Sequence, residues 1–110
     1  MRTARPLAAL VSADEYQQIM RLLSEEGVRT MLHDIPVLIR FDGDRYFVDD
    51  DIVDLYGTGA TLVEAQEDYW LAVQEAYSDL STNQDRLAPY LQDQLDFLSK
   101  VMATERETLQ

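Results

Sequence analysis

The chain has 110 residues, of which 46% are hydrophobic, so it is long enough to form one domain around a single hydrophobic core. Its formal net charge is −12, and a negative field of this size repels nucleic-acid phosphates, whose binding depends on Lys and Arg. We therefore expect a basic protein partner and no nucleic-acid binding by this chain alone. Cysteine is absent, which excludes disulfides, thiolate metal sites and cysteine nucleophiles.

The negative charge is unevenly placed along the chain. Residues 1–40 carry five acids and five arginines, whereas the remaining seventy residues carry sixteen acids and four bases. No apolar run approaches the ~18 residues of a membrane span, and residues 1–5 do not lead into a signal-peptide core. These features predict a cytoplasmic protein whose acidic surface lies in the second part of the chain.

The N-terminal part is predicted to form a strand followed at once by a helix. Pro6–Val11 is a short apolar run, and Ser12 with Glu15 has the spacing of a helix capping box. Gly27 stands where a C-terminal glycine would end this helix. The residues predicted to share its apolar face are Tyr16, Ile19, Met20 and Leu23.

Antiparallel strands are predicted next. Residues 28–34 fit either a strand or the tail of the helix. Ile35–Phe41 reads as a strand, Asp42-Gly43 as a hairpin turn and Arg45–Val48 as the returning strand. A third strand is expected at Ile52–Tyr56, with a tight turn at Gly57-Thr58-Gly59. The fold class is therefore α+β: a small antiparallel sheet of three to four strands packed against helices.

A long amphipathic helix follows this turn. Thr61 and Glu64 have capping-box spacing, so the helix is expected to start at Thr61 and to end near Leu80. Its apolar stripe consists of Leu62, Ala65, Tyr69, Ala72, Val73, Ala76 and Leu80, extended by Val63, Trp70 and Tyr77. The opposite side consists of Glu64, Glu67, Asp68, Gln74, Glu75, Ser78 and Asp79, and only Leu71 is out of place there.

A polar break at residues 81–86 separates this helix from the last one. The last helix is expected to start close to Asp85 or Pro89, and residues 105–110 read as a frayed tail. Its predicted apolar side is Leu87, Tyr90, Leu91, Leu95, Phe97, Leu98, Val101 and Met102. The whole chain, 1–110, is thus predicted to be one domain, with parts at 1–27, 36–80 and 84–104.

Asp49, Asp50, Asp51 and Asp54 are the first candidates for a functional site. Carboxylates can bind Mg²⁺ or Ca²⁺, but the spacing does not fit a calcium-binding EF-hand loop. We favour solvated strand ends that deter edge pairing and that form an acidic patch facing a basic partner. A metal-dependent hydrolase or nuclease that uses these aspartates is the least favoured reading.

The remaining candidates have stronger structural explanations. Gly57-Thr58-Gly59 precedes a helix, which can hold an anion, but it lacks the fingerprints of nucleotide-binding loops. His33 is the only histidine and has no partner nucleophile in the sequence. We therefore expect no enzyme activity, no metal and no cofactor. Trp70, Tyr77 and Tyr90 are expected in the core or at a homodimer interface rather than stacking on bases.

Two segments resemble known families. Asp44–Val48, Tyr56–Ala65 and the acidic helix after them resemble the HicB-like antitoxin domain over about residues 36–80. The match rests on the family's glycine-threonine-glutamate-alanine signature at the start of the helix. The residues that carry it are Gly57, Gly59, Thr61, Glu64 and Ala65. A shorter segment, Arg5–Tyr16, resembles the strand-helix junction of Phd/YefM-type antitoxins.

The HicB-like resemblance implies a fold and a role. The fold is a short antiparallel sheet whose third strand leads into a helix. The role is to neutralise a small basic ribonuclease toxin by covering its active site, as a dimer or larger assembly. The alternative is a stand-alone homo-oligomeric domain with a regulatory role and no toxin partner.

Overall fold

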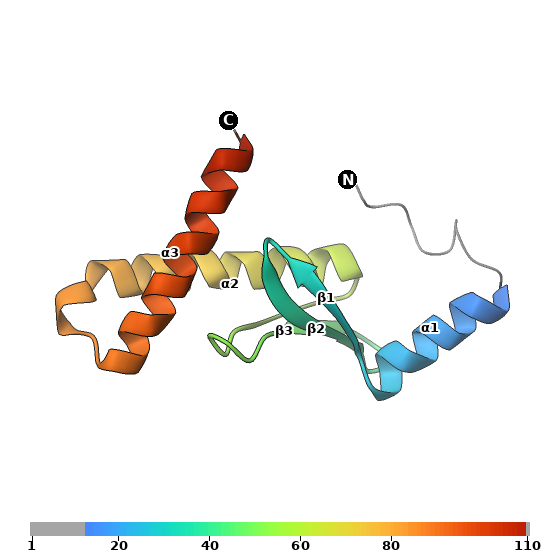
Figure 1. Cartoon of the computed structure of the whole chain (residues 1–110). Coiled ribbons are helices and arrows are strands. Elements are labelled where there is room, and N and C mark those ends of the chain that lie inside the picture. The colour runs from blue at the N-terminus through green and yellow to red at the C-terminus, as the bar shows by residue number, and fades with distance from the viewer. Residues whose placement is uncertain (1–12, 110) are drawn as a thin grey trace.

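The computed structural model describes the backbone of residues 13–109 and the side chains of residues 17–106. Its elements in chain order are α1 (Ala13–Glu25), β1 (Val28–Leu32), β2 (Ile35–Phe41), β3 (Tyr46–Asp49), β4 (Tyr56–Gly59), α2 (Leu62–Thr82), the short 3₁₀ turn η2 (Gln84–Arg86) and α3 (Pro89–Leu109). The strands form one antiparallel sheet in the order β1-β2-β3-β4. The predicted α+β class is therefore confirmed, with four strands (Figure 1).

The N-terminal predictions are only partly open to comparison. The strand expected at Pro6–Val11, the capping box of Ser12 and Glu15, and the side chain of Tyr16 lie outside the described residues. The end of α1 is as predicted, because Gly27 has a φ of +83° and its N–H donates to the carbonyl of Leu22 at 2.6 Å.

Residues 28–34, which the sequence left open, form β1 and a tight turn. His33 and Asp34 have φ values of 50° and 66°, and two successive positive φ values are what a two-residue type I′ hairpin turn requires. The next hairpin turns at Asp42, whose Oδ1 accepts the N–H groups of Asp44 and Arg45, both at 2.8 Å. These backbone donors hold the pKa of Asp42 below its ordinary value.

The strand expected at Ile52–Tyr56 is wrong. Residues 50–55 form a loop that lies between β3 and β4, and the last strand is Tyr56–Gly59. The sequence predicted a tight turn at Gly57 and Gly59, but both residues lie inside a strand. The physical reason is close packing. A Cβ on Gly57 would lie 2.1 Å from the backbone nitrogen of Tyr69, and one on Gly59 would lie 2.6 Å from that of Ala65.

Helix α2 covers one face of the sheet and α3 crosses α2, while α1 lies at the opposite end of the sheet and packs on β2 (Figure 1). The buried core between these layers comprises Leu23, Ile35, Val37, Ile39, Val48, Val53, Ala65, Tyr69, Val73, Leu98 and Val101. Within residues 13–109, no helix is long and apolar enough to cross a membrane.

The two long helices follow the predicted patterns. The capping box is present: Glu64 N–H donates to Thr61 Oγ1 at 3.1 Å and Thr61 N–H donates to Glu64 Oε1 at 3.2 Å. The predicted stripe of α2 faces the core except at Val63, which is 60% exposed, and Leu71 is 54% exposed as its place on the polar side suggested. Helix α3 starts at Pro89, one of the two expected starts, but it continues to Leu109 instead of fraying at residue 105.

Candidate protein-binding surfaces

Asp50 organises the loop after β3 instead of facing a partner. Its Oδ1 accepts the N–H groups of Ile52, Val53 and Asp54 at 2.9, 2.7 and 3.1 Å, and its Oδ2 accepts that of Leu55 at 3.3 Å. A carboxylate that bonds these four consecutive N–H groups prevents them from joining a sheet. This explains why residues 52–55, despite their β-branched side chains, do not form the expected strand.

A buried hydrogen bond ties this loop to helix α2. The hydroxyl of Tyr69, which is fully buried, donates to Asp50 Oδ2 at 2.6 Å, and Asp50 itself is only 8% exposed. Burial, together with this hydrogen bond, raises the pKa of Tyr69 far above its ordinary value. No local sequence pattern indicates this pair, because the two residues are nineteen positions apart.

The other predicted partner-binding aspartates differ in availability. Asp49 forms an ion pair with Arg40 across the strand pair, at 2.7 Å. Asp51 and Asp54 are exposed, and Asp54 has a φ of +59°. Among the described residues, no group of three or more His, Cys, Asp or Glu side chains is placed to hold a metal ion. Two of the four predicted residues, Asp51 and Asp54, thus present carboxylates to solvent.

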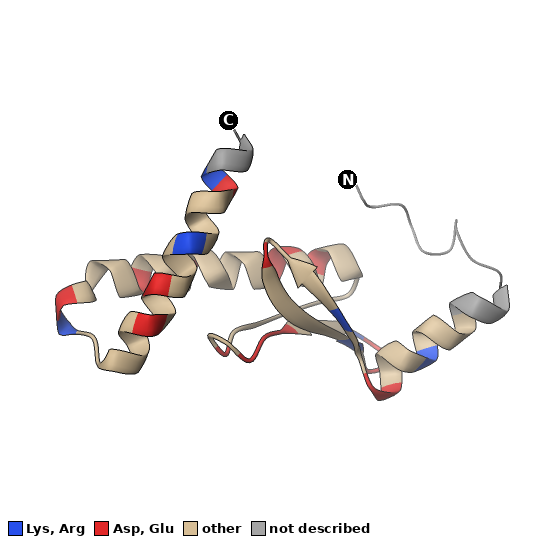
Figure 2. Ribbon diagram, in the orientation of Figure 1, with Lys and Arg blue, Asp and Glu red and all other residues tan. Residues whose placement is uncertain are grey.

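A second acidic surface lies on the outer side of α2. The helix carries five acids, Glu64, Glu67, Asp68, Glu75 and Asp79, all exposed, and no Lys or Arg. Four of them, Glu64, Asp68, Glu75 and Asp79, stand at positions i, i+4, i+11 and i+15, which places them along one line of the helix. We call these four residues, with the exposed Leu71 among them, the acidic stripe. Figure 2 shows acidic residues and no Lys or Arg along α2.

One carboxylate of the stripe also protects the edge of the sheet. Asp68 Oδ2 accepts the N–H of Thr58 in β4 at 2.9 Å. Because β4 is an edge strand, the N–H of Thr58 would otherwise be free to pair with a strand of another molecule, and this bond occupies it. Glu64 is likewise engaged in the helix cap, so Glu75 and Asp79 are the stripe carboxylates most open to a partner.

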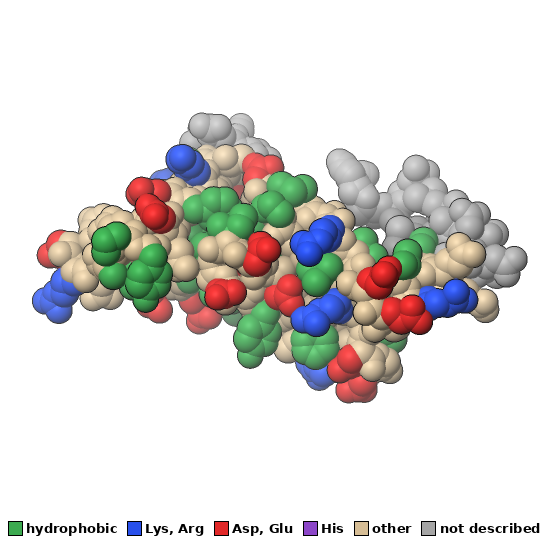
Figure 3. Space-filling view, turned by 60° about the horizontal axis from the view of Figure 1, so that its bottom comes forward, with side chains coloured by type: hydrophobic (Ala, Val, Ile, Leu, Met, Phe, Trp, Pro, Cys, Tyr) green, Lys and Arg blue, Asp and Glu red, His purple; other side chains and the backbone are tan. Residues whose placement is uncertain are grey.

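The sheet face turned away from α2 has α1 only at its margin, where Ser24 and Glu25 line a hollow with Arg40 and Phe47. We call it the open sheet face. Its residues alternate with those that face α2, and they are Arg29, Met31, Pro36, Leu38, Arg40, Arg45, Phe47, Asp49, Tyr56 and Thr58. Figure 3 shows arginine or lysine side chains alternating with hydrophobic ones over the sheet, with acidic side chains on both sides.

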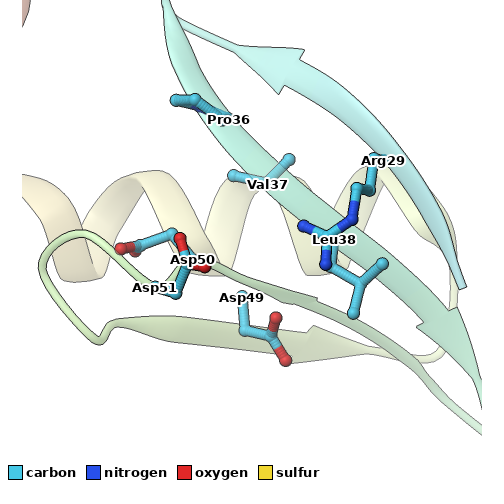
Figure 4. A pocket seen from close by; sticks show the side chains of 7 residues that line it. All are labelled: Arg29, Pro36, Val37, Leu38, Asp49, Asp50 and Asp51. Atoms are coloured by element: carbon cyan, nitrogen blue, oxygen red, sulfur yellow. The ribbon is translucent and has the colours of Figure 1, made fainter.

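Three adjoining hollows line this face. The first, of about 140 Å³, lies between Arg29, the central residues of β2 and the aspartates at the end of β3 (Figure 4). In that view Arg29 and Asp51 lie on opposite sides of the hollow. The other two, of about 510 and 270 Å³, share Arg40 and Phe47. The face is therefore shaped to receive protruding side chains.

The predicted interface aromatics do not form one surface. Trp70 and Tyr77 are partly buried and line a hollow of about 280 Å³ with Met102 of α3. Tyr90 is 67% exposed, but it precedes Met102 by twelve residues on α3, about 18 Å along the helix axis at 1.5 Å per residue. Trp70 and Tyr77 pack against the core of the chain, and the interface expected at the three aromatics stays a prediction.

His33 joins three elements. Its ring stacks on Trp70 of α2 with centroids 3.9 Å apart, and its Nδ1 lies 2.9 Å from Glu105 Oε2 of α3. This contact holds the β1–β2 turn against both long helices and gives Glu105, expected in a frayed tail, a partner. The sequence contained no signal for it, since neither partner is near His33 in the chain.

The signature residues form one structural junction. Gly57 and Gly59 let the backbone of α2 approach β4, Thr61 and Glu64 cap the helix, and Ala65 is fully buried at the contact. No protein-family model matches the chain, and no curated protein or solved structure is significantly similar to it.

Proposed function

We propose that this chain is a non-catalytic, antitoxin-like protein that binds a small basic ribonuclease in the cytoplasm and covers its active site. The observation that carries the proposal is the acidic stripe of α2. It presents solvent-exposed carboxylates and an exposed leucine on a helix that has no Lys or Arg. Such a surface is complementary to the cationic cleft with which a ribonuclease binds RNA phosphates.

The stripe combines two kinds of interaction. Glu75 and Asp79 supply long-range attraction, which speeds the encounter with a basic protein and weakens as salt rises. Leu71 is 54% exposed and lies among these acids. It can form the apolar centre of an interface whose polar rim is made by the carboxylates. Together they favour a protein partner over a small ion or an extended polymer.

The residues with catalytic potential have structural roles that agree with a binding function. The carboxylate of Asp50 is occupied by loop N–H groups and by Tyr69, and His33 is occupied by Trp70 and Glu105. The resemblance of Gly57–Ala65 to the HicB-like signature supports the same role. It rests largely on other residues than the charge argument does, because Glu64 alone belongs to both the junction and the stripe.

The test mixes the purified chain with a small basic protein encoded by the neighbouring gene. Isothermal titration calorimetry at moderate salt is expected to show saturable binding that weakens as salt is raised. Cleavage of a labelled RNA by that protein is expected to stop when the chain is added in equal amount. Absence of both binding heat and inhibition would refute the proposal.

A further inference from the structure

The open sheet face gathers cations on an otherwise acidic protein. Of the seven Lys and Arg side chains in residues 17–106, three lie on this face: Arg29, Arg40 and Arg45. The helix that covers the other face has five acids and no Lys or Arg. A second copy of this chain, with a net charge of −12, is therefore repelled at α2 and finds its attractive contacts at the sheet.

The same face carries the side-chain types that form the centres of interfaces. Met31 and Tyr56 are 58% and 66% exposed, and Leu38 and Phe47 are only partly covered. Methionine, aromatic residues and arginine are enriched at the buried centres of protein interfaces. Ile52, 41% exposed in the adjoining loop, extends the apolar surface.

Charges on this face are only partly satisfied within the chain. Arg40 pairs with Asp49, and Arg45 Nε donates to Thr58 Oγ1 at 3.2 Å. In the described part of the chain, Arg29 has no carboxylate within 4.0 Å, although Asp51 lies on the other side of the same hollow (Figure 4). One face thus presents an available cation and available carboxylates side by side.

We propose that a second copy of this chain docks on the open sheet face in a two-fold symmetric contact. In such a contact each surface meets its own copy, so Arg29 of each protomer faces Asp51 and Asp54 of its partner. Leu38, Phe47 and Tyr56 are covered at the centre. This interface replaces the one expected at Trp70, Tyr77 and Tyr90, and it leaves the acidic stripe of α2 exposed in the dimer.

A nucleic acid fits the face less well than a second copy does. Arginines beside Phe47 and Tyr56 are typical of surfaces on which bases stack. However, acidic side chains stand on both sides of the arginines, within reach of a phosphate backbone that crosses the sheet (Figure 3). A second copy brings its own cations to these carboxylates, whereas a polyanion does not.

Sedimentation equilibrium of the full chain tests the proposal. The wild type is expected to dimerise, and Tyr56→Ser and Arg29→Glu are each expected to raise the dimer dissociation constant at least tenfold. The double variant Asp51→Arg/Asp54→Arg is expected to weaken the dimer in the same way. Mixed with Arg29→Glu, it is expected to restore a heterodimer, because both charge pairs are then complementary. Circular dichroism of each variant checks its fold.

Tyr90→Ser is the matched control, since Tyr90 is as exposed as Tyr56 but lies off the face; its dimer constant is expected to equal that of the wild type. A wild-type chain that stays monomeric up to about 1 mM would overturn the proposal, because at that concentration even ~4 kcal/mol of association is visible. Loss of the dimer in Tyr90→Ser, or absence of charge-swap rescue, would overturn it too. Binding of a labelled single-stranded RNA that Arg29→Glu abolishes would assign the face to nucleic acid instead.

Discussion

Replacement of Gly57 by alanine tests the contact between β4 and α2. The added Cβ would lie 2.1 Å from Tyr69 N, which is 1.3 Å closer than the 3.4 Å at which ordinary contact begins. Its next neighbours, Tyr69 Cα and Ala65 O, are also backbone atoms, so no side-chain rotation relieves the clash. The helix must move away from the sheet. Overpacking typically costs 1–3 kcal/mol, and we expect the upper end, about 3 kcal/mol.

Urea denaturation followed by circular dichroism measures this loss. Gly43→Ala is the matched control: it has a φ of +99° and nothing within 4 Å of its added Cβ, so it loses only about 1–2 kcal/mol, through backbone strain. Gly59→Ala, with a Cβ 2.6 Å from Ala65 N, is expected between the two. A Gly57→Ala variant as stable as Gly43→Ala would refute the close-packing explanation.

Three further changes test other contacts. Tyr69→Phe removes the hydroxyl bond to Asp50 and is expected to cost about 1.5–3 kcal/mol in urea unfolding, the range for a bond to a charged group. The pKa of Tyr69 is raised on folding, so the unfolded chain loses this proton first, above the ordinary pKa of 10.0. The free energy of unfolding is therefore unaffected by this group below about pH 10 and falls as the pH rises further. Tyr69→Phe should lack this part of the fall, and a pH dependence identical to that of the wild type would contradict the assignment. Thr61→Ala loses the cap at a cost of about 1 kcal/mol, with binding of the ribonuclease unchanged; a large loss of binding at intact stability would place the site at the junction. His33→Asn removes the ring that stacks on Trp70, the chain's single tryptophan, while asparagine still tolerates the left-handed backbone of the turn. We expect about 1 kcal/mol of destabilisation and a red-shifted tryptophan emission. An unchanged emission spectrum would argue against the stack.

Local patterns predicted the elements that depend on neighbours in the sequence. Ile35–Phe41 is rich in β-branched and apolar residues and ends at the turn signal Asp42-Gly43, so its strand was predictable. The capping box of Thr61 and Glu64 closes within four residues and fixed the start of α2. The apolar stripe of that helix identified most of what covers the sheet, including Ala65.

The errors arose where distant groups outweigh local preference. Residues 52–55 have strand-forming side chains, but Asp50 binds their N–H groups and is itself held by Tyr69 from α2. Gly57 is a poor strand former, yet it lies in β4 because only glycine lets the helix backbone approach.

The open sheet face was equally invisible in the sequence. Arg29 and Arg40 are brought together by the pairing register of β1 and β2, which sets Arg29 opposite Leu38. Before that register is known, each arginine reads as an isolated surface charge. The acidic stripe, in contrast, lies on one helix, and its four carboxylates were already predicted to share the outer side of α2.

The most direct test of the binding account is calorimetry of the Glu75→Lys/Asp79→Lys variant with the basic ribonuclease, beside the wild type and Thr61→Ala. Both changed residues are exposed, so the fold should be retained. We expect affinity at least tenfold weaker, about 1.4 kcal/mol, for the charge-reversed helix and unchanged affinity for Thr61→Ala. Wild-type affinity in the charge-reversed variant would contradict the claim that the acidic stripe of α2 is the binding surface.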